Sequence, residues 1–358
     1  MTSTTATIRL ATGFSNSSPF HDEGLSSSLD NTALPHWVEV AVIGSGFAGL
    51  GAAIELGVRK HSVLVVEAAT VGSDPFASGL GFLHESLPES ALLPNDEALA
   101  RQVSAAASDA HRWTGRVINE LAIECDLDLD AMPNTVDPFA YYSGLLGVAI
   151  AQGVTIRQDT RALSLHPLRG GGFEIHTTAG RFRAGQVVVA DPTLLNVLAP
   201  KTPVTLKPQQ WVYLVTESIG ANVPTTSDPG LRELEGRRLL AGAAVSGVFA
   251  DARDELGARL LGSQPSLQSA SGDGNEVRIT NAWQATFLLS TDGIPHAGEH
   301  GGVYYIVPGA ETDLARMAWL GSRTARWMTG EPKPVLCDLP PLRKLALAGR
   351  AIKTKIGR

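Results

Sequence analysis

Six consecutive residues have the spacing of a phosphate-binding turn: Gly44, Ser45, Gly46, Phe47, Ala48 and Gly49. In such a turn the first glycine permits a tight bend, the second lets a phosphate approach the backbone, and the third lets a helix pack closely on a strand. The start of the following helix offers free N–H groups and a partial positive charge. Glu67 ends the next apolar run, where a carboxylate accepts hydrogen bonds from an adenosine ribose. These residues predict a dinucleotide site, and by themselves they do not separate NAD from FAD.

Three elements must position this turn. Residues 38–43 and 63–67 are apolar enough to form buried strands, and residues 49–58 have helical composition. A strand, a glycine turn, a helix and a second strand within about 30 residues make a βαβ unit. The alternative is a glycine-rich turn without a ligand beside a surface glutamate, and it leaves the agreement of these four features unexplained.

The rest of the chain alternates between helix and strand signals up to about residue 203 and is mainly β-like from there. Apolar residues at steps of three and four predict an amphipathic helix that starts near Asn95 and continues through Leu121. Further helices are expected at 139–151 and 312–329. Strands are expected at 154–157, 173–177, 187–190, 211–216, 243–249, 277–280, 282–289 and 303–307.

Composition narrows the class of protein. The chain has 358 residues, 44% of them apolar, and a net charge of -7, which argues against a protein that grips nucleic acid through a broad basic face. Two cysteines are too few for a disulfide scaffold, and the nine histidines show no metal-binding spacing. Residues 1–36 read as a disordered tail, and no run is apolar enough to span a membrane. We expect a soluble, cytoplasmic protein without a metal site.

Two further motifs carry a resemblance to a known family. The loop after Glu67 contains Ala77-Ser78-Gly79-Leu80-Gly81, and residues 291–298 read TDGIPHAG, followed by a strand and Gly309. Together with the glycine turn, they resemble the FAD-dependent D-amino-acid oxidase superfamily, which includes glycine and sarcosine oxidases. Within it the sequence is most similar to the FAD oxidase domain of the bacterial enzyme that matures the 5-methylaminomethyl-2-thiouridine wobble base of tRNA. The resemblance spans roughly residues 38–340.

The resemblance implies an α/β fold with two interwoven domains. One is a Rossmann-like, doubly wound FAD-binding domain, and the other is an antiparallel-sheet substrate domain. The FAD-binding domain is expected to comprise residues 38–90, 138–202 and 292–358, and the substrate domain residues 91–137 and 203–291.

The resemblance also implies the residues that contact non-covalent FAD. Cys125 and Cys337 do not match the family's covalent attachment point, which falls near Ala285. The glycine turn would hold the pyrophosphate, and Glu67 the ribose. Ala77, Ser78, Gly79 and Gly81 would line the flavin, and Ala162 would contact the adenine. Ala190 would lie at the end of a strand beside the cofactor. Asp292, Gly293 and Gly309 would lie at the isoalloxazine end.

The sequence departs from the family at three places. Many members carry an arginine for the substrate carboxylate five residues before the signature aspartate, and here that residue is Phe287. The glycine-rich stretch after the last strand contains Glu311 and Asp313, which add negative charge near the flavin unless their side chains cap the helix. Asp191 replaces the usual glycine after the strand at 187–190. These departures leave the residues of the predicted dinucleotide turn unchanged. They concern the residues expected around the substrate and the flavin, and therefore the oxidase activity.

The function implied is oxidation of a C–N bond in an amine or an amino-acid-derived substrate. Hydride would pass to flavin N5, water would hydrolyse the resulting imine, and dioxygen would be the electron acceptor. This chemistry depends on positioning more than on a protein acid or base, so no catalytic residue is assigned. The substrate-side candidates are His84, Trp283, Phe287 and His296, and packing in a loop or in the core is the alternative for His84, Trp283 and His296.

Two other hypotheses remain open at this point. The departures are also those expected of a non-catalytic, FAD-binding subunit of a larger complex. A third hypothesis is a pathway-specific oxidoreductase for a bulky or carrier-bound substrate. The tail after Asp338 is basic, from Arg343 to Arg358, and reads either as a solvated helix or as a docking site for an acidic protein partner.

Overall fold

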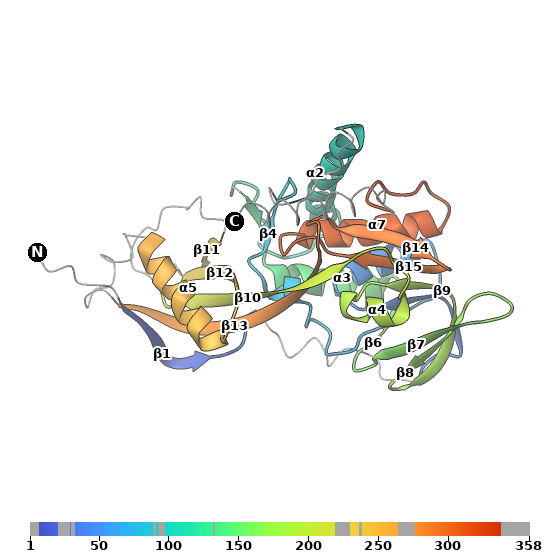
Figure 1. Ribbon diagram of the computed structural model, residues 1–358, viewed down its shortest axis with the longest axis horizontal. Coiled ribbons are helices and arrows are strands. Elements are labelled where there is room, and N and C mark those ends of the chain that lie inside the picture. The colour runs from blue at the N-terminus through green and yellow to red at the C-terminus, as the bar shows by residue number, and fades with distance from the viewer. Residues whose placement is uncertain are drawn as a thin grey trace, which may run out of the picture. The chain divides into compact units, whose positions relative to one another are not determined.

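The computed structural model describes residues 7–20, 29, 33–88, 91, 97–131, 133–218, 230–235, 238–263 and 276–337. The chain divides into two compact units, whose elements are labelled in Figure 1. Unit 1 comprises Met1–Asp22, Ala77–Gly81 and Pro208–Phe287, and unit 2 comprises Glu23–Phe76, Phe82–Lys207 and Leu288–Arg358. Each unit is therefore assembled from segments that lie far apart in the sequence.

Unit 2 is built on a largely parallel sheet with the strand order β14-β15-β9-β2-β3-β6. β2 pairs in parallel with β3 and with β9, and β9 pairs in parallel with β15. An antiparallel hairpin of β7 and β8 is joined to β9. The strands are β2 (Trp37–Ile43), β3 (Val63–Val66), β6 (Thr155–Arg157), β7 (Ala162–Pro167), β8 (Phe173–Thr177), β9 (Gly180–Val189), β14 (His296–His300) and β15 (Val303–Val307).

The central strands of this sheet are buried on both faces. Every residue of β3 is buried, and so are residues 40–43 of β2. Parallel strands covered on both sides are near-continuous apolar runs, which is why the sequence identifies them. β2, β3 and β9 share one hydrophobic cluster with the short helix α4 (Leu195–Leu198). The expected α/β, doubly wound fold is thus confirmed for this unit.

The described residues of unit 2 form four further helices and two short strands. Asp137 begins one of the helices, because its carboxylate accepts hydrogen bonds from the N–H groups of Phe139 and Ala140 at 2.9 Å. The elements are α1 (Phe47–Val58), α2 (Glu97–Glu120), α3 (Pro138–Ala151), α7 (Leu314–Met328), β4 (Phe82–Leu83), β5 (Asn134–Thr135) and the 3-10 turns η2 (Pro75–Ser78, which continues into unit 1) and η3 (Pro192–Leu194).

Helices α1 and α7 pack against each other at close range. A Cβ added to Gly51 of α1 would overlap the carbonyl of Ala318 in α7. A Cβ added to Gly321 of α7 would overlap the carbonyl of Ala48 in α1. The two glycines therefore allow backbone-to-backbone contact, and this contact fixes where the start of α1 lies.

Unit 1 is a five-stranded sheet with the order β1-β13-β10-β12-β11. One face packs under α5 in a cluster that includes Val212, Leu239 and Ile279. On β10 and β13, Trp211, Tyr213 and Trp283 stack in sequence, with ring centroids 5.9 and 5.5 Å apart. The elements are β1 (Thr7–Ser15), β10 (Leu206–Thr216), β11 (Leu231–Leu234), β12 (Arg238–Val245), α5 (Phe249–Ser263) and β13 (Glu276–Ser290).

The expectation of a disordered tail over residues 1–36 is wrong for Thr7–Ser15. This segment forms β1, which pairs in parallel with β13 at the edge of the unit 1 sheet. Phe14 packs against the core cluster of that unit, and Ala11 is buried. The abundance of serine and threonine in residues 1–36 suggested disorder. Threonine and isoleucine are also strand formers, so the same composition permits a strand.

The expected domain boundaries differ from the structure at α2. Residues 91–137 were expected in the substrate domain, whereas the described part of this segment belongs to unit 2. There Thr114 of α2 donates a hydrogen bond to the carbonyl of Ala315 in α7 at 3.2 Å. An amphipathic pattern shows which face of a helix is buried, but not which element buries it.

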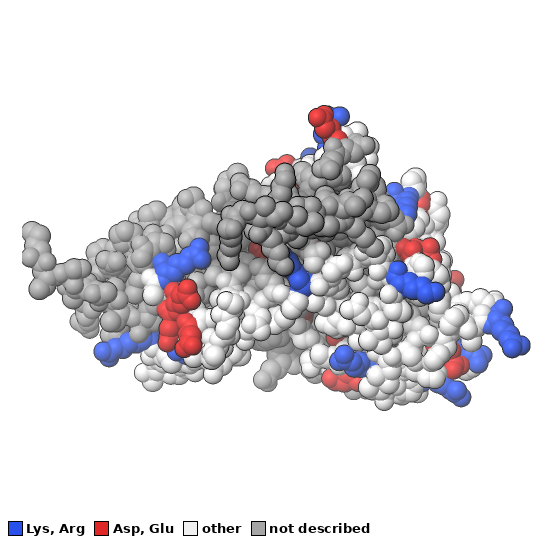
Figure 2. Space-filling model, in the orientation of Figure 1, with Lys and Arg blue, Asp and Glu red and all other residues white. Residues whose placement is uncertain are grey.

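The surface of the described residues has mixed charge. Figure 2 shows acidic and basic side chains interspersed over the described part of the face in view. Among the described helices, none combines the length and the apolar character needed to cross a bilayer. The basic tail predicted to dock a partner lies outside the described residues.

The contact between α1 and α7 yields a test of the fold. Gly51→Ala should destabilise the protein by roughly 1–3 kcal/mol, because the added methyl group has no space against Ala318. Gly115 of α2 has open space around it, so Gly115→Ala should instead stabilise the protein by roughly 0.5–1 kcal/mol. Urea unfolding of both variants measures the two effects. Equal effects of the same sign would contradict the close packing.

Candidate functional site

The glycine turn connects β2 to α1 in the conformation that its spacing predicts. Gly44 has a φ of +102°, and its N–H donates to the carbonyl of Val66 at 2.9 Å. A Cβ on Gly44 would lie 2.9 Å from the backbone nitrogen of Asp191, and one on Gly49 would overlap the carbonyl of Gly44. Both positions therefore require glycine: the first for its backbone angle, and the second for the packing of helix on strand.

Glu67 follows β3 and holds the turn in place. Its Oε2 accepts hydrogen bonds from the backbone N–H and the hydroxyl of Ser45, at 2.8 and 2.9 Å. Its Oε1 accepts one from the N–H of Ala69 at 3.0 Å. A carboxylate has about four lone-pair sites, so Glu67 keeps the capacity to accept from a ribose hydroxyl. Tyr142 of α3 supports the same turn by donating to the carbonyl of Ser45 at 3.1 Å.

Asp74 is a third acidic group at the turn, and sequence reasoning missed it. Its Oδ2 accepts from the N–H of Phe47, the first residue of α1, at 3.0 Å, and its Oδ1 accepts from Phe76 at 2.9 Å. A Cβ on Gly46 would overlap Oδ2. Burial raises the pKa of Asp74 to about 6, and the charges of Glu67 and Asp191 add to the shift. No spacing rule connects residue 74 with the turn, because a loop brings it there.

The other residues expected near the adenine half lie around the same sheet. Ala162 is the first residue of β7 and is buried. Ala190 follows β9 and donates to the carbonyl of Ile43 at 2.8 Å, which places the end of β9 beside the glycine turn. Asp191 caps η3 by accepting from the N–H of Thr193 at 2.9 Å. The contact of Ala162 with adenine stays a prediction.

The segment expected to line the flavin, Ala77–Gly81, belongs to unit 1. The carbonyl of Ser78 accepts a hydrogen bond from Nε1 of Trp283 at 3.1 Å. The carbonyl of Leu80 accepts one from Nη1 of Arg232 at 3.0 Å. Trp283, which was expected at the substrate, therefore uses its indole N–H to hold this segment. Its contact with a substrate stays a prediction.

Phe287 is buried near the end of β13, with 1% of its surface exposed. The aromatic ring thus occupies an apolar interior position of unit 1. A carboxylate placed against it would lose hydration without gaining a charged partner from this residue. The position is consistent with an apolar contact, and its role toward a substrate stays a prediction.

His84 follows β4 in unit 2. Burial lowers the pKa of His84 to about 4, and the charge of Arg316 acts in the same direction. The imidazole is therefore neutral at pH 7, and its Nε2 has no hydrogen-bond partner among the described residues. Its ring packs edge-on against Phe82, with centroids 5.8 Å apart.

The signature segment between β13 and β14 forms a turn that is held by hydrogen bonds among neighbouring residues. Asp292 accepts hydrogen bonds from the hydroxyl of Ser290 at 2.9 Å, from the N–H of Ile294 at 3.1 Å and from Nε2 of His296 at 3.0 Å. Gly293 has a φ of +73°, which explains the glycine. A Cβ on Gly309 would overlap the backbone of Ile294, so the signature turn and the Gly309 loop touch.

The side chain of Asp313 makes no capping hydrogen bond to α7, and it turns back onto the loop that precedes the helix. Its Oδ2 accepts from the N–H groups of Gly309 and Ala310 at 2.6 and 2.9 Å, and its Oδ1 pairs with Nε of Arg316. Both charged side chains are fully buried, and the pairing compensates the carboxylate charge. Burial raises the pKa of Glu311 above its usual value.

Arg316 also ties two loops to the start of α7. Its Nη1 donates to the carbonyls of His84 and Ser86 at 3.2 and 3.1 Å, and its Nη2 donates to the carbonyl of Thr312 at 3.0 Å. Sequence reasoning missed this arginine, because an arginine inside a helix reads as a surface residue.

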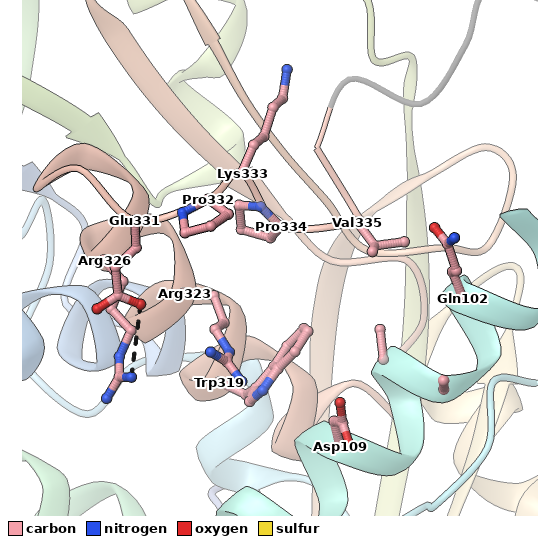
Figure 3. A pocket seen from close by; sticks show the side chains of 12 residues that line it. Gln102, Asp109, Trp319, Arg323, Arg326, Glu331, Pro332, Lys333, Pro334 and Val335 are labelled. Carbon is pink, nitrogen blue, oxygen red and sulfur yellow. Dashed lines mark ion pairs between the residues drawn. The ribbon is translucent and has the colours of Figure 1, made fainter.

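A separate cavity of about 390 Å³ lies between α2, α7 and residues 331–335 (Figure 3). Trp319 forms part of its wall, with the guanidinium of Arg323 5.7 Å from the ring centroid. Arg326 is paired with Glu331 at 3.9 Å, shown by the dashed line in Figure 3. No residue of the glycine turn lines this cavity. The cavity is therefore separate from the predicted dinucleotide site.

The described residues contain no group of three or more His, Cys, Asp or Glu side chains that could hold a metal ion. Cys125 and Cys337 are both buried, and neither forms a disulfide. Burial raises the pKa of Cys125 to about 12, so this thiol is not ionised at neutral pH.

Comparison with known proteins supports the dinucleotide assignment. A family described as FAD dependent oxidoreductase matches residues 39–132 and 130–327. No curated protein matches the sequence. Three similar solved structures are glycine oxidase from Geobacillus kaustophilus, with a TM-score of 0.69, iminodiacetate oxidase from a Chelativorans species, with 0.66, and L-proline dehydrogenase from P. horikoshii, with 0.62.

These structures agree with the chain over nearly their whole length. The identities are 16%, 17% and 17%; the alignments cover 84%, 85% and 84% of this chain and 96%, 98% and 96% of the other chains, in the same order. At such identities the likeness establishes the fold. The narrower likeness to the tRNA-maturing oxidase domain stays a prediction.

The residues around the glycine turn fit FAD, the cofactor of this family. Gly44, Gly46 and Gly49 would hold the pyrophosphate, and Glu67 the ribose. One feature opposes the fit: the carboxylate of Asp74 already accepts from the N–H of Phe47, at the positive end of α1.

Gly46→Val should yield largely apoprotein. The branched side chain would stand between the backbone and the pyrophosphate, and it would also displace Asp74. Flavin absorbance per mole of purified protein measures the occupancy. Gly147→Val on α3, where a Cβ meets open space, is the matched control. Purification of the Gly46 variant with full flavin occupancy would show that the turn does not bind the pyrophosphate.

Glu67→Ala should weaken FAD binding by about tenfold or more. Hydrogen bonds to a charged group contribute roughly 1.5–3 kcal/mol, and this variant also loses the bonds that hold Ser45. Titration of apoprotein with FAD, followed by flavin fluorescence, gives the affinity. The exposed Glu85→Ala is the control and should bind as the unchanged protein does. An unchanged affinity for Glu67→Ala would mean that its carboxylate does not reach the ribose.

Proposed function

Because the chain belongs to the FAD dependent oxidoreductase family, we propose that it oxidises a C–N bond of an amine or amino-acid-derived substrate. FAD, when bound, supplies the chemistry by accepting a hydride at N5 from the carbon next to nitrogen. Water then hydrolyses the imine product. The observation that carries the proposal is the glycine turn with Glu67, within a chain that matches the family from residue 39 to residue 327.

The solved structures with the same fold favour this chemistry. Glycine oxidase, iminodiacetate oxidase and L-proline dehydrogenase are each named for an amino acid or an imino-diacid. A fold by itself does not establish a reaction, since one fold hosts many functions. The names support a C–N bond as the target of the reaction, and the residues of this chain are used to narrow the substrate.

Phe287 narrows the substrate to one without a free carboxylate at that position. Its ring is buried, and an apolar ring cannot compensate the desolvation of a carboxylate. We therefore propose an apolar or aromatic amine, or an amino acid whose carboxylate is masked as an ester, an amide or a carrier thioester. Arg278 of β13 is the alternative anchor that would permit a free carboxylate.

The chain's own residues bind and position rather than transfer protons. His84 is neutral at pH 7 and lacks a described partner at Nε2, whereas His296 is bonded to Asp292. Neither is assigned a catalytic step, because positioning is sufficient for hydride transfer. Dioxygen as the electron acceptor and a cytoplasmic location belong to the same proposal.

A second candidate function is a non-catalytic, FAD-binding subunit of a larger complex. Asp313 favours it, because its carboxylate accepts from the N–H groups of Gly309 and Ala310. Those N–H groups are then unavailable to stabilise negative charge on a reduced flavin. The pairing of Asp313 with Arg316 limits this argument, since it compensates the added charge.

The substrate proposal is tested by anaerobic reduction of the bound flavin. Hydrophobic amines and amino-acid esters should bleach it at least about tenfold faster than free glycine, sarcosine or D-amino acids, the ratio expected from one lost charge-assisted hydrogen bond. Rapid bleaching by free amino acids that survives in Phe287→Leu and disappears in Arg278→Ala would show that the carboxylate anchor is Arg278. A flavin that no substrate bleaches would favour the subunit.

A further inference from the structure

Asp74 occupies the place where a bound pyrophosphate is expected. Its Oδ2 accepts a hydrogen bond from the N–H of Phe47 at 3.0 Å. Phe47 is the first residue of the twelve-residue helix α1. The side chain crosses directly over Gly46, since a Cβ there would overlap Oδ2. Oδ1 is held by the N–H of Phe76 at 2.9 Å. The carboxylate thus accepts the same helix-end donor that an anionic phosphate would use.

The surroundings of Asp74 are acidic. Glu67 lies at the end of β3, Asp191 at the end of β9, and both charges act on Asp74. Tyr142 of α3 faces it as well, and burial keeps the pKa of that phenol above its usual value, so it stays protonated. Among the described residues, no basic side chain pairs with Asp74.

Asp313 provides an internal comparison. Its Oδ2 accepts from two backbone N–H groups of the loop before α7, whereas each oxygen of Asp74 accepts from one backbone N–H. Asp313 also has a buried arginine partner, Arg316, whose charge compensates that of the carboxylate. Among the described residues, Asp74 has backbone N–H donors, acidic neighbours and the phenol of Tyr142, but no arginine or lysine partner. A dianionic pyrophosphate brought to the same place would add further repulsion to this carboxylate.

We propose that Asp74 takes the place of the pyrophosphate in the apoprotein and binds one proton when FAD binds, so that the affinity for FAD falls as the pH rises. This inference rests on FAD binding at the glycine turn, and it concerns the regulation of that site. In the complex the neutral acid becomes a donor toward a phosphate oxygen, while Phe47 N–H turns to the phosphate. One anionic group then replaces another at the end of α1, and the proton removes the charge of Asp74 from beside the pyrophosphate.

The direction of the pH dependence follows from the ionisation of Asp74. Its pKa is raised by burial to about 6, so below that pH the apoprotein already carries the proton and FAD binds without proton uptake. Above about pH 6, each FAD bound takes up one proton, and the Kd rises by up to about tenfold per pH unit. Removal of the ionisable group should remove this dependence.

The test is titration of apoprotein with FAD, followed by flavin fluorescence, between about pH 6 and about pH 8. The Kd of the unchanged protein should rise by roughly 30- to 100-fold over this range. Asp74→Asn keeps the shape of the side chain, and its Kd should change by less than about threefold. At about pH 8 it should bind FAD at least about tenfold more tightly than the unchanged protein. Calorimetry in buffers of different ionisation enthalpy should show proton uptake near pH 7.5 only when Asp74 is present.

Asp191→Asn is the matched control, because it removes a nearby charge but touches η3 rather than α1. It should keep the pH dependence of the unchanged protein. The proposal is overturned if Asp74→Asn retains that dependence and binds no more tightly, or if Asp191→Asn abolishes the dependence equally. Absence of FAD binding by all three proteins at every pH would overturn the assignment of the cofactor site together with the proposal. Binding that is tight at every pH and insensitive to Asp74 would overturn the proposal alone.

Discussion

The position of α1 constrains the whole of unit 2. Its first turn lies between the ends of β2, β3 and β9, and its side is held against α7 by backbone contact at Gly51 and Gly321. Glycine at these contacts leaves no side chain that could relax the spacing. A shift of α1 by a fraction of an ångström would therefore break either the helix contact or the bond from Gly44 to Val66. The glycine turn is held in place by this packing.

Three carboxylates converge on that rigid turn. Glu67 contributes to its structure by holding Ser45, Asp191 caps η3 beside it, and Asp74 holds the first residue of α1. Without a ligand, the helix end and the backbone N–H groups compensate this concentration of negative charge. A dianionic ligand changes the balance. In the proposal above, cofactor binding is therefore linked to protonation of Asp74. Near α7, by contrast, the buried Arg316 compensates the negative charge of Asp313.

The proposed substrate contacts come from unit 1. The Ala77–Gly81 segment is held there by Trp283 and Arg232, and Phe287 is buried in the same unit. Trp283 stacks on Tyr213, so the side chain that holds the segment is itself held. An apolar, aromatic environment of this kind favours substrates without a free charge. The family membership and these contacts lead to one consistent proposal, amine oxidation on an apolar or masked substrate.

The sequence alone determined the glycine turn, the strands at 38–43 and 63–67, the helices at 139–151 and 312–329, and the family. Each of these depends on local spacing or on apolar runs, which a linear pattern records. It could not show that Thr7–Ser15 is a strand or that α2 belongs to unit 2, because both depend on a partner far along the chain. Only the tertiary structure brought Asp74 to the start of α1 and Arg316 to Asp313, since loop conformation and burial decide which polar groups meet.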